Sequence, residues 1–201
     1  MIKDIHIFMR QLAKSRPLFH SEADFQHTFA WQLHQQFPDS RIRLEYPVKL
    51  STRIYVDIWL TTDQLTLAIE LKYKTKLFNT THDGEDYMLK MQGAQDLGRY
   101  DFLKDVQRLE QIIEQSTKRT MGFAILLTND PLYWKSAAKD TIDADFRLDD
   151  SREISGVLSW REDASEGTMH KRQNPIVLRN RYRPQWQSYH DSFRYLALAL
   201  D

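Results

Sequence analysis

The chain contains 201 residues, of which 41% are hydrophobic and 12% aromatic, enough to bury a core within one domain. Its 28 basic and 28 acidic residues cancel, so no overall field draws the protein to nucleic acid or to anionic lipid. The absence of cysteine excludes disulfides, thiolate metal sites and a cysteine nucleophile. No apolar run approaches the roughly 20 residues of a membrane-spanning helix. We therefore expect a cytoplasmic protein with no membrane partner.

The N-terminal quarter of the sequence predicts two helices followed by a strand. Residues 2–14 have helical spacing, and Ser21 is a suitable N-cap for a second helix over residues 21–37. Apolar side chains recur every four residues along this second helix and give it one buried face. Residues 41–50 alternate between apolar and polar side chains, which predicts the first strand.

The next segment predicts a β-hairpin that carries three charged residues. Residues 53–60 and 65–73 are rich in β-branched and aromatic side chains and are separated by a short polar turn. Counting back from that turn along both strands places Asp57 opposite Glu70. Side-chain alternation places Lys72 on the same strand face as Glu70.

Two facing carboxylates in apolar surroundings indicate a bound cation. Opposed like charges with Cβ atoms roughly 5 Å apart are destabilising. Lys72 supplies part of the compensating charge, and Mg²⁺ or Mn²⁺ would suit the remaining carboxylate oxygens. The alternative is an ordinary surface hairpin whose Asp57, Glu70 and Lys72 form a weak ion-pair cluster.

The remainder of the chain predicts further sheet and helix. Residues 74–90 are polar and irregular, which predicts a long loop, and an amphipathic helix follows, from residue 92 or 100 to about 118. Residues 121–128 predict a central buried strand. The weaker signals beyond predict a short helix over 131–138, strands over 154–160 and 176–178, and a strand or helix over 193–200. We expect one α/β domain over residues 1–201, with a mixed sheet flanked by helices, a core at about 21–129 and a C-terminal elaboration at about 130–201.

An Asp on one strand followed by Glu-x-Lys on the next resembles the PD-(D/E)XK nuclease superfamily, over about residues 21–129. The resemblance implies a restriction-endonuclease-like core. It also implies that Asp57 and Glu70 bind one or two Mg²⁺ ions, that the main-chain carbonyl of Leu71 is a further ligand, and that Lys72 assists at the scissile phosphate. The proline of the motif is absent, because Val56 precedes Asp57. Members without this proline are common, so its absence makes the subgroup harder to identify but says little against the chemistry.

The resemblance extends to residues on the flanking helices. Many members place a Glu on the helix before the first strand, and Glu22 matches that position as a conditional fourth catalytic and metal-binding residue. The alternative is that Glu22 only complements the helix dipole. Members often carry a Gln or Lys on the later helix, for which Gln92, Gln95 and Lys104 are candidates; each could also be helix surface.

The sequence also suggests how Lys72 acts and where substrate binds. An ammonium beside two carboxylates has a raised pKa, so we assign Lys72 to positioning water and stabilising charge rather than to proton abstraction. Lys74 and Lys76 continue its strand and could contact phosphates, although a lysine-rich segment is usually solvated surface. Residues 167–195 hold six basic residues and one acid, a candidate basic patch that includes Arg181 and Arg183. We expect the aromatic residues of that stretch to pack onto the domain; the alternative is that they stack on bases.

The resulting hypothesis is a Mg²⁺- or Mn²⁺-dependent DNA endonuclease acting in restriction, repair or mobile-element defence. A homodimer is possible, since a double-strand cut usually requires two active sites. Two alternatives stay open: a catalytically inactive module of the same fold that binds nucleic acid or a protein partner, and a metal-dependent hydrolase of another substrate such as RNA.

Overall fold

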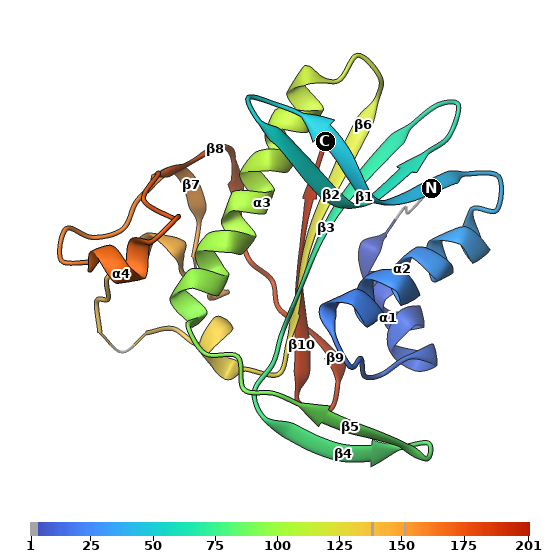
Figure 1. The fold of residues 1–201 in the computed structure, drawn as a ribbon, viewed down its shortest axis with the longest axis horizontal. Coiled ribbons are helices and arrows are strands. Elements are labelled where there is room, and N and C mark those ends of the chain that lie inside the picture. Colours follow the sequence, from blue (N-terminus) through green and yellow to red (C-terminus); the bar gives the residue numbers. More distant parts are fainter. Residues whose placement is uncertain (1–3, 138, 151) are drawn as a thin grey trace.

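A six-stranded mixed sheet forms the centre of the computed structural model, which describes residues 4–137, 139–150 and 152–201 (Figure 1). The strands lie in the order β1, β2, β3, β6, β10, β9. Only β3 and β6 are parallel, and every other neighbouring pair is antiparallel. The bounds are β1 Arg41–Lys49, β2 Arg53–Thr61, β3 Thr66–Lys74, β6 Thr120–Thr128, β9 Gln187–His190 and β10 Phe193–Leu200. The expected mixed sheet flanked by helices is therefore confirmed.

Helices cover both faces of this sheet. Helices α1 (Ile5–Ser15) and α2 (Glu22–Gln36) lie on one face, and α3 (Gln95–Gln115) lies on the other (Figure 1). The hydroxyl of Ser21 accepts a hydrogen bond from the main-chain N–H of Asp24, so the predicted N-cap of α2 is confirmed. No helix of the described residues is long and apolar enough to cross a membrane.

Two hydrophobic clusters fill the layers on either side of the sheet. The first joins α1 and α2 to side chains such as Ile69 and Leu71 of β3. The second joins α3 to β6, β10 and the C-terminal segments. Because alternate residues of β3 enter opposite clusters, Ala68, Glu70 and Lys72 face the α3 side.

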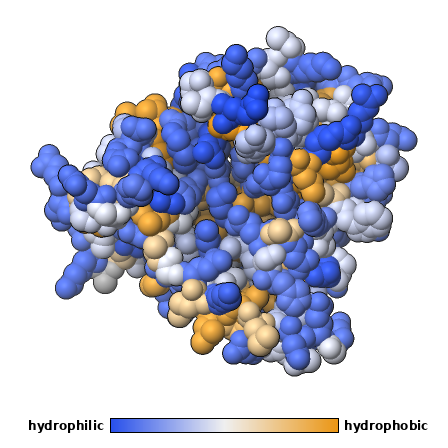
Figure 2. Space-filling model, in the orientation of Figure 1, coloured by the Kyte–Doolittle hydropathy of each residue, from blue (hydrophilic) through white to orange (hydrophobic). Residues whose placement is uncertain are grey.

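Two hairpins extend the fold beyond the sheet. Strands β4 (Phe78–His82) and β5 (Glu85–Leu89) form a hairpin at one end of the molecule, and β7 (Ile154–Leu158) pairs with β8 (Ile176–Tyr182) on the outer side of α3 (Figure 1). Short elements complete the chain: the 3-10 turns η1 (Pro131–Tyr133) and η2 (Ala144–Phe146), and helix α4 (Glu166–Met169). Figure 2 shows a mostly hydrophilic face, with hydrophobic residues gathered near the start of the β4–β5 hairpin, where Leu77 and Met91 are exposed.

The β1–β2 hairpin bends where it leaves the sheet. Strands β2 and β3 pair only as far as Ile58 and Ile69, whereas β3 and β6 stay paired to Lys74 and Thr128. Beyond the bend, β2 is paired with β1 alone. Glu45 lies opposite this point in β1 and has a left-handed φ of 48°. One edge of β3 is therefore open from Glu70 onward.

The bend exchanges the two faces of the hairpin. On the side of the bend that pairs with β3, even-numbered residues such as Ile58 and Leu60 join the cluster beneath α1 and α2. On the other side, even-numbered residues such as Val56 and Ile54 pack against the α3 cluster. The exchange brings Tyr46 and Trp59 into stacked contact, with ring centroids 4.8 Å apart.

Most predicted elements are present, but the predicted loop over residues 74–90 is wrong. It contains strands β4 and β5, whose polar sequences hide the alternation because only Tyr87 and Leu89 of β5 are buried. Asp83 and Gly84 both have positive φ, at 51° and 81°, so an Asp-Gly hairpin turn was the missed signal. Strand β9 was also missed.

The C-terminal expectations were mixed. The ambiguous segment over 193–200 is strand β10, and the expected short helix over 131–138 is only the 3-10 turn η1; residue 138 lies outside the described residues, as do residues 2 and 3 of the expected first helix. The aromatic side chains do pack onto the domain, since Trp186, Tyr189 and Phe193 are buried.

Candidate active site

Asp57 lies at the point where β2 leaves β3. It follows the last paired residue, Ile58, in the direction of the bend. The paired residues have the register that the sequence predicted, but the ladder ends before Asp57 and Glu70 can pair. Its Oδ2 accepts a 2.6 Å hydrogen bond from the main-chain N–H of Leu71. Its main-chain carbonyl accepts a 2.7 Å hydrogen bond from Nε2 of Gln26. A side-chain carboxylate thus replaces the missing strand as partner of the open edge.

Glu22 satisfies the next donor along the same edge. Its Oε2 accepts a 2.7 Å hydrogen bond from the main-chain N–H of Tyr73. Glu22 comes from the first turn of α2, so the residue that the helix dipole would favour there also reaches β3. The structure therefore brings Glu22 to the same strand edge as Asp57.

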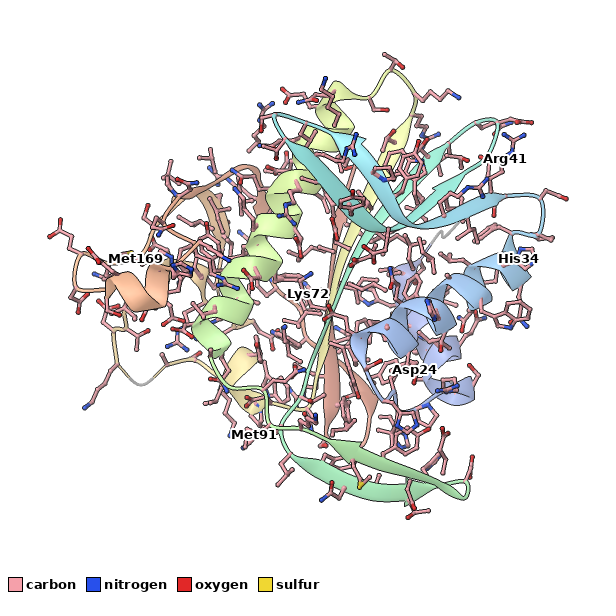
Figure 3. The ribbon with its side chains drawn as sticks, viewed as in Figure 1. Asp24, His34, Arg41, Lys72, Met91 and Met169 are labelled. Carbon is pink, nitrogen blue, oxygen red and sulfur yellow. The ribbon has the colours of Figure 1, made fainter. Side chains whose placement is uncertain are left out.

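Lys72 joins β3 to α3. Its Nζ lies 2.7 Å from Oδ2 of Asp105 and donates a 3.3 Å hydrogen bond to the main-chain carbonyl of Leu71. The other oxygen of Asp105 contacts Arg108 at 2.8 Å. Figure 3 shows Lys72 at the centre of the molecule, between α2 and α3. The Leu71 carbonyl that the resemblance assigned to a metal is thus in contact with an ammonium.

Glu70 has a buried oxygen without a partner. The residue is only 3% exposed, and its Oε1 has no hydrogen-bond partner among the described residues. Asp105 and Asp57 both act on it electrostatically, opposed by Lys72 and Arg108. A buried polar atom of this kind costs about 1–3 kcal/mol when it stays unsatisfied.

Burial and like charge shift the acidity of the cluster. Burial raises the pKa of Asp57 to about 6, although Lys72 and the Leu71 N–H oppose the rise. Burial, with the neighbouring carboxylates of Asp105 and Asp57, raises the pKa of Glu70 well above its usual range. Burial alone would lower the pKa of Lys72, but the same two carboxylates outweigh it and raise that pKa above its ordinary value. Lys72 is therefore a stable cation.

The cluster contains more acidic than basic side chains. Four carboxylates interact here, those of Glu22, Asp57, Glu70 and Asp105, against the two cations Lys72 and Arg108. Carboxylate oxygens are the ligands that Mg²⁺ and Mn²⁺ prefer. Over the described ranges, no three acidic or histidine side chains already have the arrangement of a metal site. The donor types and the orphaned Glu70 oxygen nevertheless fit a divalent cation.

Four of the residues expected to bind substrate lie near the end of β3 or the start of α3. Lys74 ends β3, and the main-chain N–H of Lys76 donates a 2.7 Å hydrogen bond to Asn129. Gln92 accepts a 3.2 Å hydrogen bond from the Thr75 N–H. Gln95 donates a 2.7 Å hydrogen bond to Asp130 at the start of α3. These contacts tie the end of β3, the end of β6 and the start of α3 together, below the acidic cluster.

The C-terminal arginines lie apart from this cluster. Arg181 and Arg183 both contact the carboxylate of Glu153, at 3.3 and 2.9 Å, on the β7–β8 side of the molecule. Arg179 is paired with Glu114 and Arg172 with Asp101. The excess of cations in this part of the sequence is therefore largely compensated by acids from other segments, which the sequence could not show.

Two site residues escaped the sequence analysis. Asp105 is 3% exposed although it lies on the apolar face of α3, three residues after Phe102 and four before Leu109. Gln26 is similarly buried, between Phe25 and Phe29 in α2. A polar residue within an apolar helical stripe was the available signal, because burying such a group requires a partner.

The fold and the cluster define a mixed-sheet α/β protein with carboxylates and one lysine gathered at an open strand edge. No protein-family model, curated protein or solved structure matches the chain.

Proposed function

We propose that this protein is a Mg²⁺- or Mn²⁺-dependent DNA endonuclease of the PD-(D/E)XK type, with β1, β2, β3 and β6 as a restriction-endonuclease-like core. The observation that carries the proposal is the buried Glu70 oxygen without a partner, beside Asp57 and Asp105. A structural ion-pair cluster would be expected to satisfy such an atom. A site that binds a cation would leave this oxygen free to act as a ligand.

The residues of the cluster have separate roles in the proposed mechanism. Asp57 and Glu70 would hold the divalent cation, with Glu22 able to contribute its second oxygen. The hydrogen bonds from Leu71 and Tyr73 fix two of these carboxylates on the strand edge. When bound, the cation would supply an activated water and relieve charge on the leaving oxygen of a phosphodiester.

Lys72 stabilises charge rather than removing a proton. Its raised pKa keeps it an ammonium near neutral pH. Asp105 and Arg108 hold that ammonium beside the Leu71 carbonyl, so it can face the negative charge that develops on a phosphate. Asp105 is a positioning residue in this arrangement.

Incubation of plasmid, linear duplex and branched DNA with Mg²⁺ or Mn²⁺ tests the proposal. We expect cleavage by the wild-type protein and a loss of about a thousandfold in Asp57→Asn and Glu70→Gln, because each removes a carboxylate that would hold the cation, and the cation stabilises the transition state. Asp101→Asn, which changes a half-exposed carboxylate of α3 paired with Arg172, is the matched control and should cleave normally. RNA is included as a competing substrate.

Two results would contradict the proposal. Cleavage that survives both substitutions would place the chemistry elsewhere. No cleavage of any substrate, together with no binding of Mg²⁺ or Mn²⁺ by calorimetry, would favour the alternative of an inactive binding module. Light scattering with and without duplex DNA would show whether a homodimer accompanies double-strand cutting.

A further inference from the structure

The bent part of the β1–β2 hairpin forms an arm that packs on the α3 cluster. We define the arm as residues 46–56, beyond the bend at Glu45 and Asp57 (Figure 1). Its even-numbered apolar residues, among them Val48 and Ile54, pack against the α3 cluster. Its odd-numbered residues therefore face outward, away from α3.

The outward face of the arm places two cations directly opposite each other. Lys49 and Arg53 are cross-strand partners, and both are exposed. Like charges in this position destabilise a hairpin. Neither has a carboxylate within ion-pair distance among the described residues, whereas Arg172, Arg181 and Arg183 do.

The rest of this face also suits a polyanion. Tyr55 is 53% exposed beside Arg53, opposite Pro47. The only acid in residues 41–56 is Glu45, and its carboxylate accepts a 2.8 Å hydrogen bond from Gln26. Opposed cations with an exposed aromatic ring match the requirements of a sugar-phosphate backbone.

We propose that the outward face of the arm binds the backbone of duplex DNA and holds it across the acidic cluster. The inference rests on the proposed function for the identity of the polyanion. Arg53 lies four residues before Asp57 on one strand, about 13 Å at the usual rise. That distance spans about four base steps of B-DNA at about 3.4 Å per step. The arm would therefore contact phosphates about four steps from the scissile bond.

Fluorescence anisotropy with a labelled 20-base-pair duplex tests the arm without cleavage. The Asp57→Asn protein serves as background, and Lys49→Gln/Arg53→Gln is compared with Arg10→Gln/Lys14→Gln on α1. Each pair removes two exposed positive charges. We expect the arm pair to weaken binding at least about tenfold and to reduce the slope of log K against log salt by about 2, one unit per phosphate contact. The α1 pair should leave both quantities unchanged.

The outcomes separate the arm from the catalytic proposal. Arm-dependent binding by a protein that cleaves nothing would support the arm and contradict the hydrolysis. Cleavage with no effect of the arm pair on affinity, or an equal effect of the α1 pair, would overturn the arm. Arm-dependent binding of duplex RNA but not DNA would overturn DNA as the partner. If the cations only protect an edge strand from pairing, the arm pair will self-associate with unchanged affinity, which would also overturn the inference.

Discussion

Two buried ionic clusters contact α3, one near its start and one near its middle, and their carboxylates are satisfied to different degrees. At one end, Arg99 of α3 holds Asp143, which also accepts a 2.6 Å hydrogen bond from Thr141 and contacts Arg147 at 3.3 Å. Farther along the helix, Asp105 meets Lys72 and Arg108 next to Glu70, which keeps an oxygen without a partner. Both clusters are buried, but in the first both carboxylate oxygens of Asp143 have partners, whereas in the second Oε1 of Glu70 has none.

The pKa shifts reflect this difference. Burial would raise the pKa of Asp143, but Thr141 and Arg99 outweigh it and lower that pKa. In the Asp105 cluster, burial and carboxylate repulsion dominate and raise the pKa values of Asp57 and Glu70. The first arrangement stabilises the fold, whereas the second stores unfavourable charge that a bound cation would relieve.

Among the substitutions that test this comparison, Asp143→Asn should have the largest effect, on the stability of the protein. Removing one partner leaves Arg99 charged and buried, which we expect to cost about 3–5 kcal/mol in the free energy of unfolding. Asp101→Asn removes a half-exposed partner of Arg172 and should cost less than about 1 kcal/mol. Urea unfolding of both variants measures the difference, and equal costs would show that the first cluster is not structural.

Lys72→Gln should produce the next largest effect, on catalysis. Loss of a preorganised charge lowers the cleavage rate by about a hundredfold to a thousandfold. The measurement is the single-turnover rate at saturating Mg²⁺, with Lys14→Gln on α1 as the control. A rate near that of the wild type would remove Lys72 from the mechanism.

Glu70→Gln should stabilise the metal-free protein. The substitution neutralises a buried, unsatisfied carboxylate, so we expect a gain of about 1–3 kcal/mol in EDTA at pH 8. Added Mg²⁺ should then stabilise the wild type but not the variant, because ligand binding to the folded state raises its stability. A variant that is less stable than the wild type in EDTA would mean that the native carboxylate is already satisfied.

The smallest effect should be the dependence of metal binding on pH. The pKa of Asp57 is raised from 3.8 to about 6, so between these values the folded state holds a proton that the unfolded state has lost, and metal-free stability falls as pH rises. A metal ion requires the ionised carboxylate, so Mg²⁺ affinity should rise about tenfold per pH unit below pH 6. Calorimetry at pH 5.0, 5.5 and 7.5 checks this, and a flat affinity would place the cation away from Asp57.

Local patterns predicted much of the fold and part of the candidate site. The register of β2 and β3 followed from counting back from the turn, because the alternation along both strands is clear. The buried strand β6 and helix α3 followed from apolar runs and helical spacing. Those patterns describe residues that are close in sequence.

Contacts between residues that are distant in the sequence could not be predicted from local patterns. The pairing of Lys72 with Asp105 depends on how α3 crosses β3, and the sequence assigned the ammonium to Glu70 and Asp57 alone. The compensation of Arg181 and Arg183 by Glu153 was hidden for the same reason. The bend at Asp57 depends on how residues such as Val56 pack against α3.

The open edge of β3 has a consequence for how this protein can vary. An unpaired strand edge ordinarily invites pairing with another chain. Here two carboxylates occupy its donors, so the proposed chemistry would depend on a ladder that stops early. Extending the β2–β3 pairing by two residues would give Leu71 a main-chain acceptor and release Asp57 from the edge. If the proposed function holds, a longer and more regular sheet would be less active, and insertions in the arm should be tolerated far better than changes that straighten the bend.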